Sequence, residues 1–197
     1  MERIFPFIKR NKAVIAGFVT IIGLTACIEL RMGRSLLGPD GKFGWWEGNI
    51  WNNENSQRVA DAYSFSHVIH GILLYAFFWL VARKAPLLYR FLAAVLLEAL
   101  WEVLENSPLI INRYREATIS LGYAGDSVLN SCSDILMMAL GFLFAFHASV
   151  WTSIAAVLVM ELGCFLWVRD NLTLNVIMLI HPIAAIKAWQ AAGQPMP

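Results

Sequence analysis

The sequence has little cysteine and little charge, and both shortages restrict its class. The three cysteines, Cys27, Cys132 and Cys164, are an odd number, lie far apart within apolar runs and form no Cys-x-x-Cys pair. This pattern argues against a disulfide framework and against a cysteine-based zinc or redox site. The net charge is only +1, and no basic run is interleaved with aromatic residues. We therefore expect no nucleic-acid partner.

The chain is instead rich in apolar sequence. Hydrophobic residues make up 58% of its 197 residues and charged residues 15%, and the mean hydropathy is +0.59, well above an ordinary soluble domain. Most of the apolar segments approach the roughly 20 residues that cross about 30 Å of hydrocarbon. They lie near 13–30, 66–82, 87–105, 127–147, 150–168 and 172–186. We predict an all-α integral membrane protein, a bundle of about five to six transmembrane helices that forms a single membrane domain over residues 1–197.

The connections between these segments differ in character. The last segment is short and interrupted by His181-Pro182, so we expect it to be re-entrant or interfacial rather than spanning, which leaves five or six crossings. Residues 31–65 are rich in Gly, Asn and Trp, and because tryptophan prefers the headgroup region, they are predicted to form an outer loop on the membrane surface. Residues 106–126 are predicted to form a second outer loop.

Basic residues set the expected orientation. They precede the first segment and fill the turn before 87–105, at Arg3, Lys9, Arg10, Lys12, Arg83, Lys84 and Arg90. The positive-inside rule therefore places the N-terminus in the cytoplasm. With this topology, every Asp and Glu except Glu2 falls in the outer half of the membrane, near its midplane, or in outer loops. Acids do not set topology, so this asymmetry indicates a site.

The third apolar segment carries three glutamates on one helical face. Glu98, Glu102 and Glu105 stand at i, i+4 and i+7, which places them on the same side of a helix. An ionised carboxylate in hydrocarbon costs several kcal/mol unless it is paired, protonated or hydrated. This face is therefore a candidate site.

Two further segments offer polar groups to the same layer. Asp126, Asn130 and Asp134 share a face of the fourth segment, and His67 and His70 lie one turn apart at the start of the second. Together with the glutamates they predict an outer-leaflet polar pocket. Its members are His67, His70, Glu102, Glu105, Asp126, Asn130 and Asp134.

Three kinds of chemistry fit this set. Crowded carboxylates in a low dielectric cannot all ionise, so Glu102 or Asp134 could act as a general base with His70 as proton shuttle. Alternatively, His67, His70 and Glu102 would supply nitrogen and oxygen ligands acceptable to a divalent metal such as zinc, iron or manganese, although His-x-x-His lacks the Glu of the zinc-protease motif.

The third option is a substrate with an anionic headgroup. The forked donors of Arg113 and Arg115 suit a phosphate or carboxylate group. In this interpretation Glu105, Asp126 and Asn130 would complete the substrate-binding wall. Lipid or lipid-linked molecules are the expected partners.

The alternative is that the polar network is structural. Buried Glu, Asn, Ser and Asp can join membrane helices by hydrogen bonds worth on the order of 1 kcal/mol or less each, without any chemistry. A separate alternative concerns Leu24-Thr25-Ala26-Cys27, which resembles a bacterial lipobox and would make Cys27 a lipidated residue after cleavage. We favour an uncleaved first helix.

Several motifs together resemble an uncharacterised family of small bacterial multi-pass inner-membrane proteins of unknown function, over about residues 30–190. They are Glu54-Asn55-Ser56-Gln57, Ser66-His67-Val68-Ile69-His70-Gly71, Trp101-Glu102 with Glu105-Asn106-Ser107-Pro108, Ile111-Asn112-Arg113-Tyr114-Arg115-Glu116-Ala117-Thr118, Gly125-Asp126-Ser127-Val128-Leu129-Asn130-Ser131 and Arg169-Asp170-Asn171-Leu172-Thr173-Leu174-Asn175. The resemblance implies a location in the bacterial inner membrane but no activity.

A looser resemblance rests on the spacing of Asp126, Asn130, Asp134 and Gly141, which is similar to VanZ-like membrane proteins. That likeness implies envelope lipid or cell-wall precursor chemistry. We therefore expect the pocket to act on or bind a lipid or lipid-linked envelope molecule, and the rival is a non-enzymatic membrane binding or assembly protein. The sequence leaves open whether the pocket is catalytic, and indicates neither the substrate nor an oligomeric state.

Overall fold

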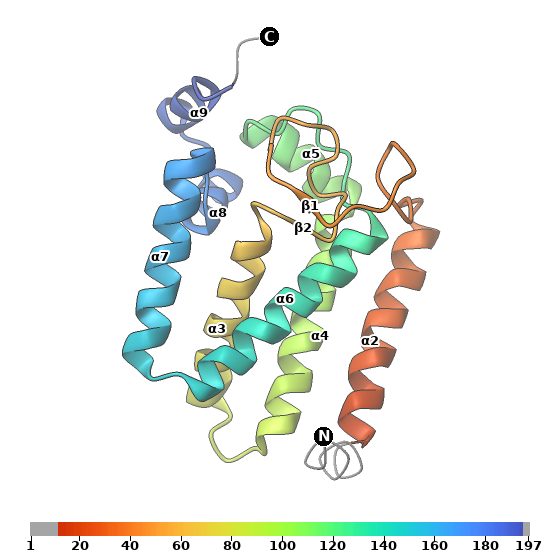
Figure 1. Cartoon of the computed structure of the whole chain (residues 1–197), viewed down its shortest axis with the longest axis vertical. Coiled ribbons are helices and arrows are strands. Elements are labelled where there is room, and N and C mark those ends of the chain that lie inside the picture. Colours follow the sequence, from red (N-terminus) through yellow and green to blue (C-terminus); the bar gives the residue numbers. More distant parts are fainter. Residues whose placement is uncertain (1–11, 195–197) are drawn as a thin grey trace.

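The apolar segments form long helices in the computed structural model, which describes residues 12–194 (Figure 1). The helices in this range are α2 (Lys12–Arg31), α3 (Ser64–Val81), α4 (Leu87–Glu105), α5 (Pro108–Ala117), α6 (Val128–His147), α7 (Val150–Val168), α8 (Leu172–Ile180) and α9 (Ala184–Ala191). The same range holds two short strands, β1 (Trp46–Glu47) and β2 (Ala60–Asp61). Arg3, Lys9 and Arg10, on which the expected orientation partly rests, lie outside the described residues, as does Glu2.

Four helices are long and apolar enough to cross a membrane, namely α2, α3, α6 and α7. Helix α4 is also 19 residues long and packs against α2, α3 and α6, but its three glutamates and Arg90 make it more polar than those four. The structure thus supports a membrane helix bundle by length and composition. Within residues 12–194 it gives four candidate spans where five or six crossings were predicted.

The last apolar segment does not form one helix. It breaks at His181-Pro182 into α8 and α9, because proline disfavours a helical residue before it. Nine residues of α8 rise only about 14 Å, too little to cross the hydrocarbon. Glu161 of α7 accepts the N–H groups of Leu172 (3.0 Å) and Thr173 (3.2 Å) and thereby fixes the start of α8.

Both predicted outer loops lie at one end of the bundle, the upper end in Figure 1, where α3 and α6 begin. Residues 31–65 include β1 and β2, which pair in parallel with Trp46 opposite Ala60. Residues 106–126 include α5, a helix that the sequence analysis did not predict. Ser107-Pro108 starts it, since proline is favoured at the first helical position.

Helices α3 and α6 approach each other unusually closely. A Cβ atom added to Gly71 would lie 2.0 Å from the carbonyl oxygen of Met138, and one added to Gly141 would lie 2.0 Å from that of Val68. Small residues allow such close backbone packing between membrane helices. Helix α6 therefore runs obliquely across α3 (Figure 1), and this crossing brings the first half of α6 to the start of α3.

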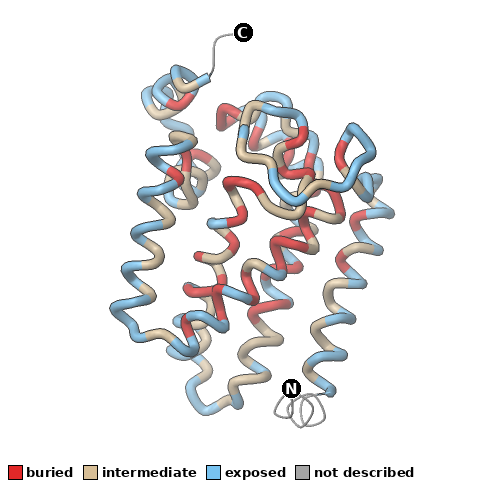
Figure 2. The backbone as a smooth tube through the Cα atoms, viewed as in Figure 1, coloured by how far each residue is buried: buried red, intermediate tan, exposed pale blue. Residues whose placement is uncertain are grey.

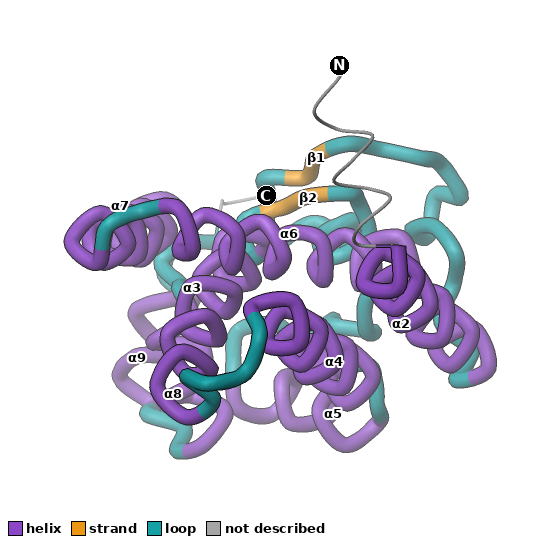
Figure 3. The backbone as a smooth tube through the Cα atoms, turned by 90° about the horizontal axis from the view of Figure 1, so that it is seen from below, coloured by secondary structure: helices purple, strands orange, loops and turns teal. Residues whose placement is uncertain are grey.

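The apolar core lies below the polar end, between α4 and α6. Its buried members are Ala94, Val95, Ala99, Ile135, Met138 and Phe142. Figure 2 shows buried residues concentrated in the upper half of the bundle and along α6, whereas α7 is largely exposed. Seen from below, α6 lies between the strands and the pair α3 and α4 (Figure 3). The outer faces carry exposed residues such as Leu158 and Leu166, as a lipid-facing surface would.

Candidate functional site

A cavity of about 390 Å³ lies at the upper end of the bundle, bordered by α3, α4, α5, α6 and α8. Its titratable and amide lining includes Asp61, His67, His70, Glu98, Glu105, Asp126, Asn130 and Asp134. Its apolar lining includes Leu73, Leu74, Leu97, Trp101, Val176 and Leu179. One cavity thus joins a polar wall to an apolar wall.

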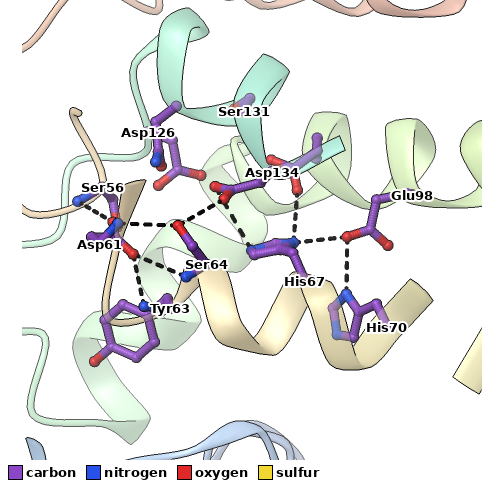
Figure 4. Close-up of polar contacts among 12 residues, drawn as sticks. Ser56, Asp61, Tyr63, Ser64, His67, His70, Glu98, Asp126, Ser131 and Asp134 are labelled. Carbon is purple, nitrogen blue, oxygen red and sulfur yellow. Dashed lines mark hydrogen bonds and ion pairs between the residues drawn. The ribbon is translucent and has the colours of Figure 1, made fainter. Parts of the chain in front are cut away.

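Glu98 is the carboxylate that meets both predicted histidines. Its Oε1 atom lies 2.7 Å from Nδ1 of His67 and 3.0 Å from Nδ1 of His70 (Figure 4). The two imidazole rings are edge to face with centroids 5.2 Å apart, as expected for residues one helical turn apart. Glu98 and His67 are buried, at 3% and 8% exposure, so this contact is shielded from water.

Asp134 faces the other side of the His67 ring. Its Oδ2 atom lies 3.8 Å from Nε2 of His67, and its Oδ1 atom accepts a 3.4 Å hydrogen bond from the Ser64 hydroxyl. The Ser64 hydroxyl in turn accepts the N–H of Asp61 at 3.0 Å. A continuous polar chain therefore runs from the loop before α3 through Asp134 and His67 to Glu98 (Figure 4).

Asp61 holds the beginning of α3 in place. Its carboxylate accepts the N–H groups of Tyr63 (2.7 Å), Ser64 (3.2 Å) and Ser56 (2.9 Å), and an acidic group at this position is favoured by the unpaired N–H groups of a helix start. Burial nevertheless raises the pKa of Asp61 above its ordinary value. The cap fixes the turn that carries His67 and His70.

Glu102 lies behind the cavity wall. It is completely buried, its Oε1 atom is 3.4 Å from Nδ1 of His67, and neither of its oxygens has a hydrogen-bond partner in residues 12–194. The predicted base Asp134 and shuttle His70 line the cavity, whereas Glu102 does not. In the predicted metal set of His67, His70 and Glu102, the structure puts Glu98 in the place of Glu102, because the rotation of α4 turns Glu98 toward both rings.

Asp126 belongs to a dense network with Asn106. Its N–H donates to Oδ1 of Asn106 at 2.7 Å, and Nδ2 of Asn106 donates to its Oδ2 at 3.1 Å and to Ser131 Oγ at 3.1 Å. Tyr123 adds a 2.8 Å hydrogen bond from its hydroxyl. Burial raises the pKa of Asp126 well above its ordinary value, and the carboxylates of Glu105 and Asp134 raise it further.

Replacing Asn106 by Ala should lower the free energy of unfolding by about 2–3 kcal/mol, because it leaves the buried Asp126 N–H without a partner and removes the donor to Asp126 Oδ2. Thermal unfolding of the detergent-purified protein measures this loss. The matched control is Asn112→Ala, since Asn112 is exposed on α5. Equal melting temperatures for the two variants would contradict the role of Asn106.

The two arginines predicted to bind substrate are used elsewhere. Arg113 donates from Nε to the Leu179 carbonyl (2.7 Å) and from Nη2 to the Ile180 carbonyl (3.3 Å), so it satisfies the end of α8, where unpaired carbonyls attract a cation. Arg115 donates to the Tyr123 carbonyl at 2.5 Å. Neither arginine lines the cavity, and the prediction that they hold an anionic headgroup there is not supported by their positions.

The other predicted binding residues do line the cavity. Glu105 is partly buried, and Asn130 is buried with Nδ2 donating to the Arg58 carbonyl at 2.9 Å. Three tyrosines that sequence reasoning missed also line it, namely Tyr63, Tyr114 and Tyr123. Tyr63 directly precedes α3 and Tyr114 lies in the last turn of α5, whereas Tyr123 lies in the loop between α5 and α6.

The electrostatic character of the cavity follows from its lining residues. Five carboxylates and two imidazoles line it, but no Lys or Arg is among its lining residues in the described chain. Such a wall accepts hydrogen bonds from hydroxyl, amide or ammonium groups and binds cations. It repels a bare anion.

Comparisons with known proteins give matches to a protein family and to several relatives. A family described as "Protein of unknown function (DUF2585)" matches residues 29–192. The chain is 48% identical over 174 residues to the UPF0314 protein of Sphingopyxis alaskensis, covering 88% of this chain and 92% of that one. It is 46% identical over 186 residues to the UPF0314 protein of Paracoccus denitrificans, covering 94% and 96%.

A third relative, the UPF0314 protein of Agrobacterium fabrum, is 50% identical over 169 residues, covering 86% of this chain and 85% of that one. No solved structure matches the chain. These matches bear out the expected membership of an uncharacterised family, whereas the looser resemblance to VanZ-like proteins is not supported by them. The UPF0314 proteins are similar to this chain over nearly its whole length. The chain therefore belongs to the DUF2585 family of proteins of unknown function.

Proposed function

We propose that this protein binds a lipid or lipid-linked envelope molecule in the cavity at the upper end of the bundle. The observation that carries the proposal is the two-sided lining of that cavity. A polar headgroup would lie against the carboxylates, histidines and tyrosines, and hydrocarbon would lie against Leu73, Leu97 and Val176. A cavity of about 390 Å³ falls in the size range of small-molecule sites.

The lining also restricts the headgroup. Arg113 and Arg115 are engaged by backbone carbonyls, so the excess of carboxylates favours a hydroxyl-rich, amide-rich or cationic headgroup over a bare phosphate. The proposed location is the bacterial inner membrane with the N-terminus in the cytoplasm, which places the cavity at the outer leaflet. The proposal therefore concerns an envelope molecule that is reached from outside the cytoplasm.

Blocking the apolar wall should remove the bound molecule. Leu97 is partly exposed at 43% and lines the cavity, whereas its neighbour Leu96, at 49% exposure, is not among the lining residues. We expect Leu97→Trp to reduce the amount of a specific lipid that copurifies in mild detergent by at least about tenfold, since the indole ring fills the space of the lipid's hydrocarbon tail. A tenfold reduction corresponds to a loss of about 1.4 kcal/mol of binding free energy. Mass spectrometry of the extracted lipids measures this reduction.

The Leu96→Trp protein is the matched control and should keep the lipid at the native level. A lipid profile that is the same in both variants would contradict the proposed binding site. Comparing the envelope lipids of cells that lack the protein with cells restored by native, Leu97→Trp or Leu96→Trp protein then identifies the molecule in vivo.

The second candidate is a structural or assembly role, and one observation favours it. The amide of Asn106 is saturated by Glu102 O, Asp126 and Ser131, as in a network that only joins helices. This network lies beside the cavity and can coexist with a binding site. If substitution of cavity residues changes only stability, with no change in copurified or cellular lipids, the structural role is the better account.

A further inference from the structure

Three potential metal ligands converge on one point of the cavity wall. His67, His70 and Glu98 each offer one ligand atom, and these atoms all lie within 4.8 Å of one another. We propose that His67, His70 and Glu98 bind a divalent transition metal of the zinc class, with a coordination position open to the cavity. The proposal is independent of which lipid, if any, the cavity takes.

The two contacts of Glu98 require little movement. With metal–ligand bonds of about 2.0–2.1 Å, neighbouring ligands of a tetrahedral ion lie about 3.3 Å apart. The observed separations from Glu98 Oε1 are 2.7 Å to His67 Nδ1 and 3.0 Å to His70 Nδ1. The two contacts would therefore widen by only about 0.3–0.6 Å to admit the ion. Small rotations about side-chain bonds accomplish this.

The donor set indicates the class of metal and of site. Two imidazoles and one carboxylate are the protein ligands of one group of catalytic zinc sites, which keep a position for water or substrate, and also of some iron sites. All three residues line the cavity, so the remaining position would face the space where a ligand enters. A structural zinc site would instead be closed by a fourth protein ligand.

Residues around the three ligands fit the outer shell of such a site. The second ring nitrogen of a metal-bound histidine usually donates a hydrogen bond to a carboxylate, a backbone carbonyl or water, which fixes the orientation of the ring. When Nδ1 of His67 faces the metal, Nε2 faces Asp134 Oδ2, 3.8 Å away. Asp134 is itself held by Ser64 and, through it, by Asp61. The chain that Figure 4 shows thus ends on the proposed ligand.

The charge balance supports the same conclusion. Glu98, Glu102 and Asp134 all lie within 4 Å of the His67 ring nitrogens, and in residues 12–194 the charged partners of these carboxylates are imidazoles, with no Lys or Arg among them. Both oxygens of the fully buried Glu102 have no hydrogen-bond partner there. A divalent cation beside them would offset the cost of burying this negative charge.

Direct metal binding tests the proposal. The full chain is purified in mild detergent, stripped with a chelator and titrated with Zn²⁺ against a coloured competing chelator, with the bound metal counted by mass spectrometry. We expect about one Zn²⁺ per chain. The His67→Ala, His70→Ala and Glu98→Gln variants should each bind at least about 100-fold more weakly, and Asp134→Asn about 10–100-fold more weakly, as outer-shell partners do.

His147→Ala is the matched control, since His147 lies at the far end of α6 and should leave the affinity unchanged. Where His67→Ala fails to fold, His70→Ala remains, because its ring is 23% exposed. The absorption spectrum of native protein loaded with Co²⁺ needs no variant at all and should show the intense visible bands of a low-coordinate nitrogen and oxygen site.

Two results overturn the proposal. One is a native protein that retains neither Zn²⁺ nor Co²⁺ after removal of free metal, and the other is unchanged affinity in the folded His70→Ala variant. Because the lipid test uses Leu97 and the metal test uses His70, the outcomes separate. Loss of the metal site with copurified lipid retained removes this inference and leaves the proposed function standing.

Discussion

Replacing Gly141 by Ala is expected to lower the stability of the protein by more than about 3 kcal/mol, the upper range for overpacked cores. An added Cβ at Gly141 would lie 2.0 Å from the Val68 carbonyl oxygen, and one at Gly71 would lie 2.0 Å from that of Met138. Both obstacles are backbone atoms in helices, so no side-chain rotation relieves the clash. The helices α3 and α6 must instead move apart.

The same displacement would damage the site. Val68 directly follows His67, and Gly71 directly follows His70, so separating α3 from α6 also separates the His67 ring from Asp134. Yield and melting temperature of the detergent-purified protein measure the first effect, and Zn²⁺ affinity of any protein that survives measures the second.

Gly163→Ala is the matched control. Gly163 lies within α7, and a Cβ added there meets nothing within 4 Å. This variant should gain about 0.5–1 kcal/mol, because alanine loses less backbone entropy in a helix than glycine does. A Gly141→Ala protein as stable as the Gly163→Ala protein would show that α3 and α6 do not pack as described.

The long helices were predictable because they rest on local composition. The predicted segments near 66–82, 87–105 and 150–168 agree with α3, α4 and α7 to within about two residues, since apolar runs of this length have few other stable forms. Helix α5 was missed because its sequence is polar. The Ser107-Pro108 start was the available signal.

The composition of the site was predictable, but its geometry was not. Spacing correctly placed Glu98 and Glu102 on one side of α4, where both are buried. Which of them meets His67 and His70 depends on how α4 is rotated against α3, and that rotation is set by tertiary packing with α6. Periodicity fixes a face about a quarter-turn wide, which is too coarse to choose between two glutamates on it.

Arg113 and Arg115 show a second reason why the site in the structure differs from the site predicted from the sequence. From the sequence, an arginine near a cluster of acids is a natural partner for an anion. In the structure, Arg113 instead meets the last carbonyls of α8, which are free because α8 ends just before His181-Pro182, and α8 reaches Arg113 because the chain reverses between α7 and α8. A contact between residues more than 60 positions apart cannot be inferred from local pattern.

The second large effect concerns pH and Asp170, which lies between α7 and α8. Asp170 is 3% exposed and accepts the Asn171 N–H at 2.9 Å and the Tyr63 hydroxyl at 3.2 Å. Burial raises its pKa from the ordinary 3.8 to about 6, against these hydrogen bonds, which lower it. The charged carboxylate therefore costs the folded protein stability.

The direction in which stability changes with pH follows from proton binding. Between about pH 4 and pH 6 the folded state keeps the proton of Asp170 while the unfolded state has released it, so stability falls as the pH rises through this range. The difference between a pKa of 3.8 and one of about 6 corresponds to about 3 kcal/mol. Asp170→Asn resembles the protonated form and should be more stable than the native protein by up to this amount at pH 8.

Melting temperatures from pH 4 to pH 8 test this expectation, and the advantage of Asp170→Asn should disappear toward pH 4. Asp40→Asn is the control with the opposite sign, since the hydrogen bond from Arg58 lowers the pKa of the exposed Asp40 carboxyl. Its variant should lose a little stability at pH 8, a loss that fades as the pH falls below about 4, the ordinary pKa of an aspartate. An Asp170→Asn advantage that stays constant across this range would contradict the raised pKa of Asp170. An Asp170→Asn protein less stable than the native protein at pH 8 would mean that the contact between Tyr63 and the Asp170 carboxylate stabilises the folded state as an ionic hydrogen bond.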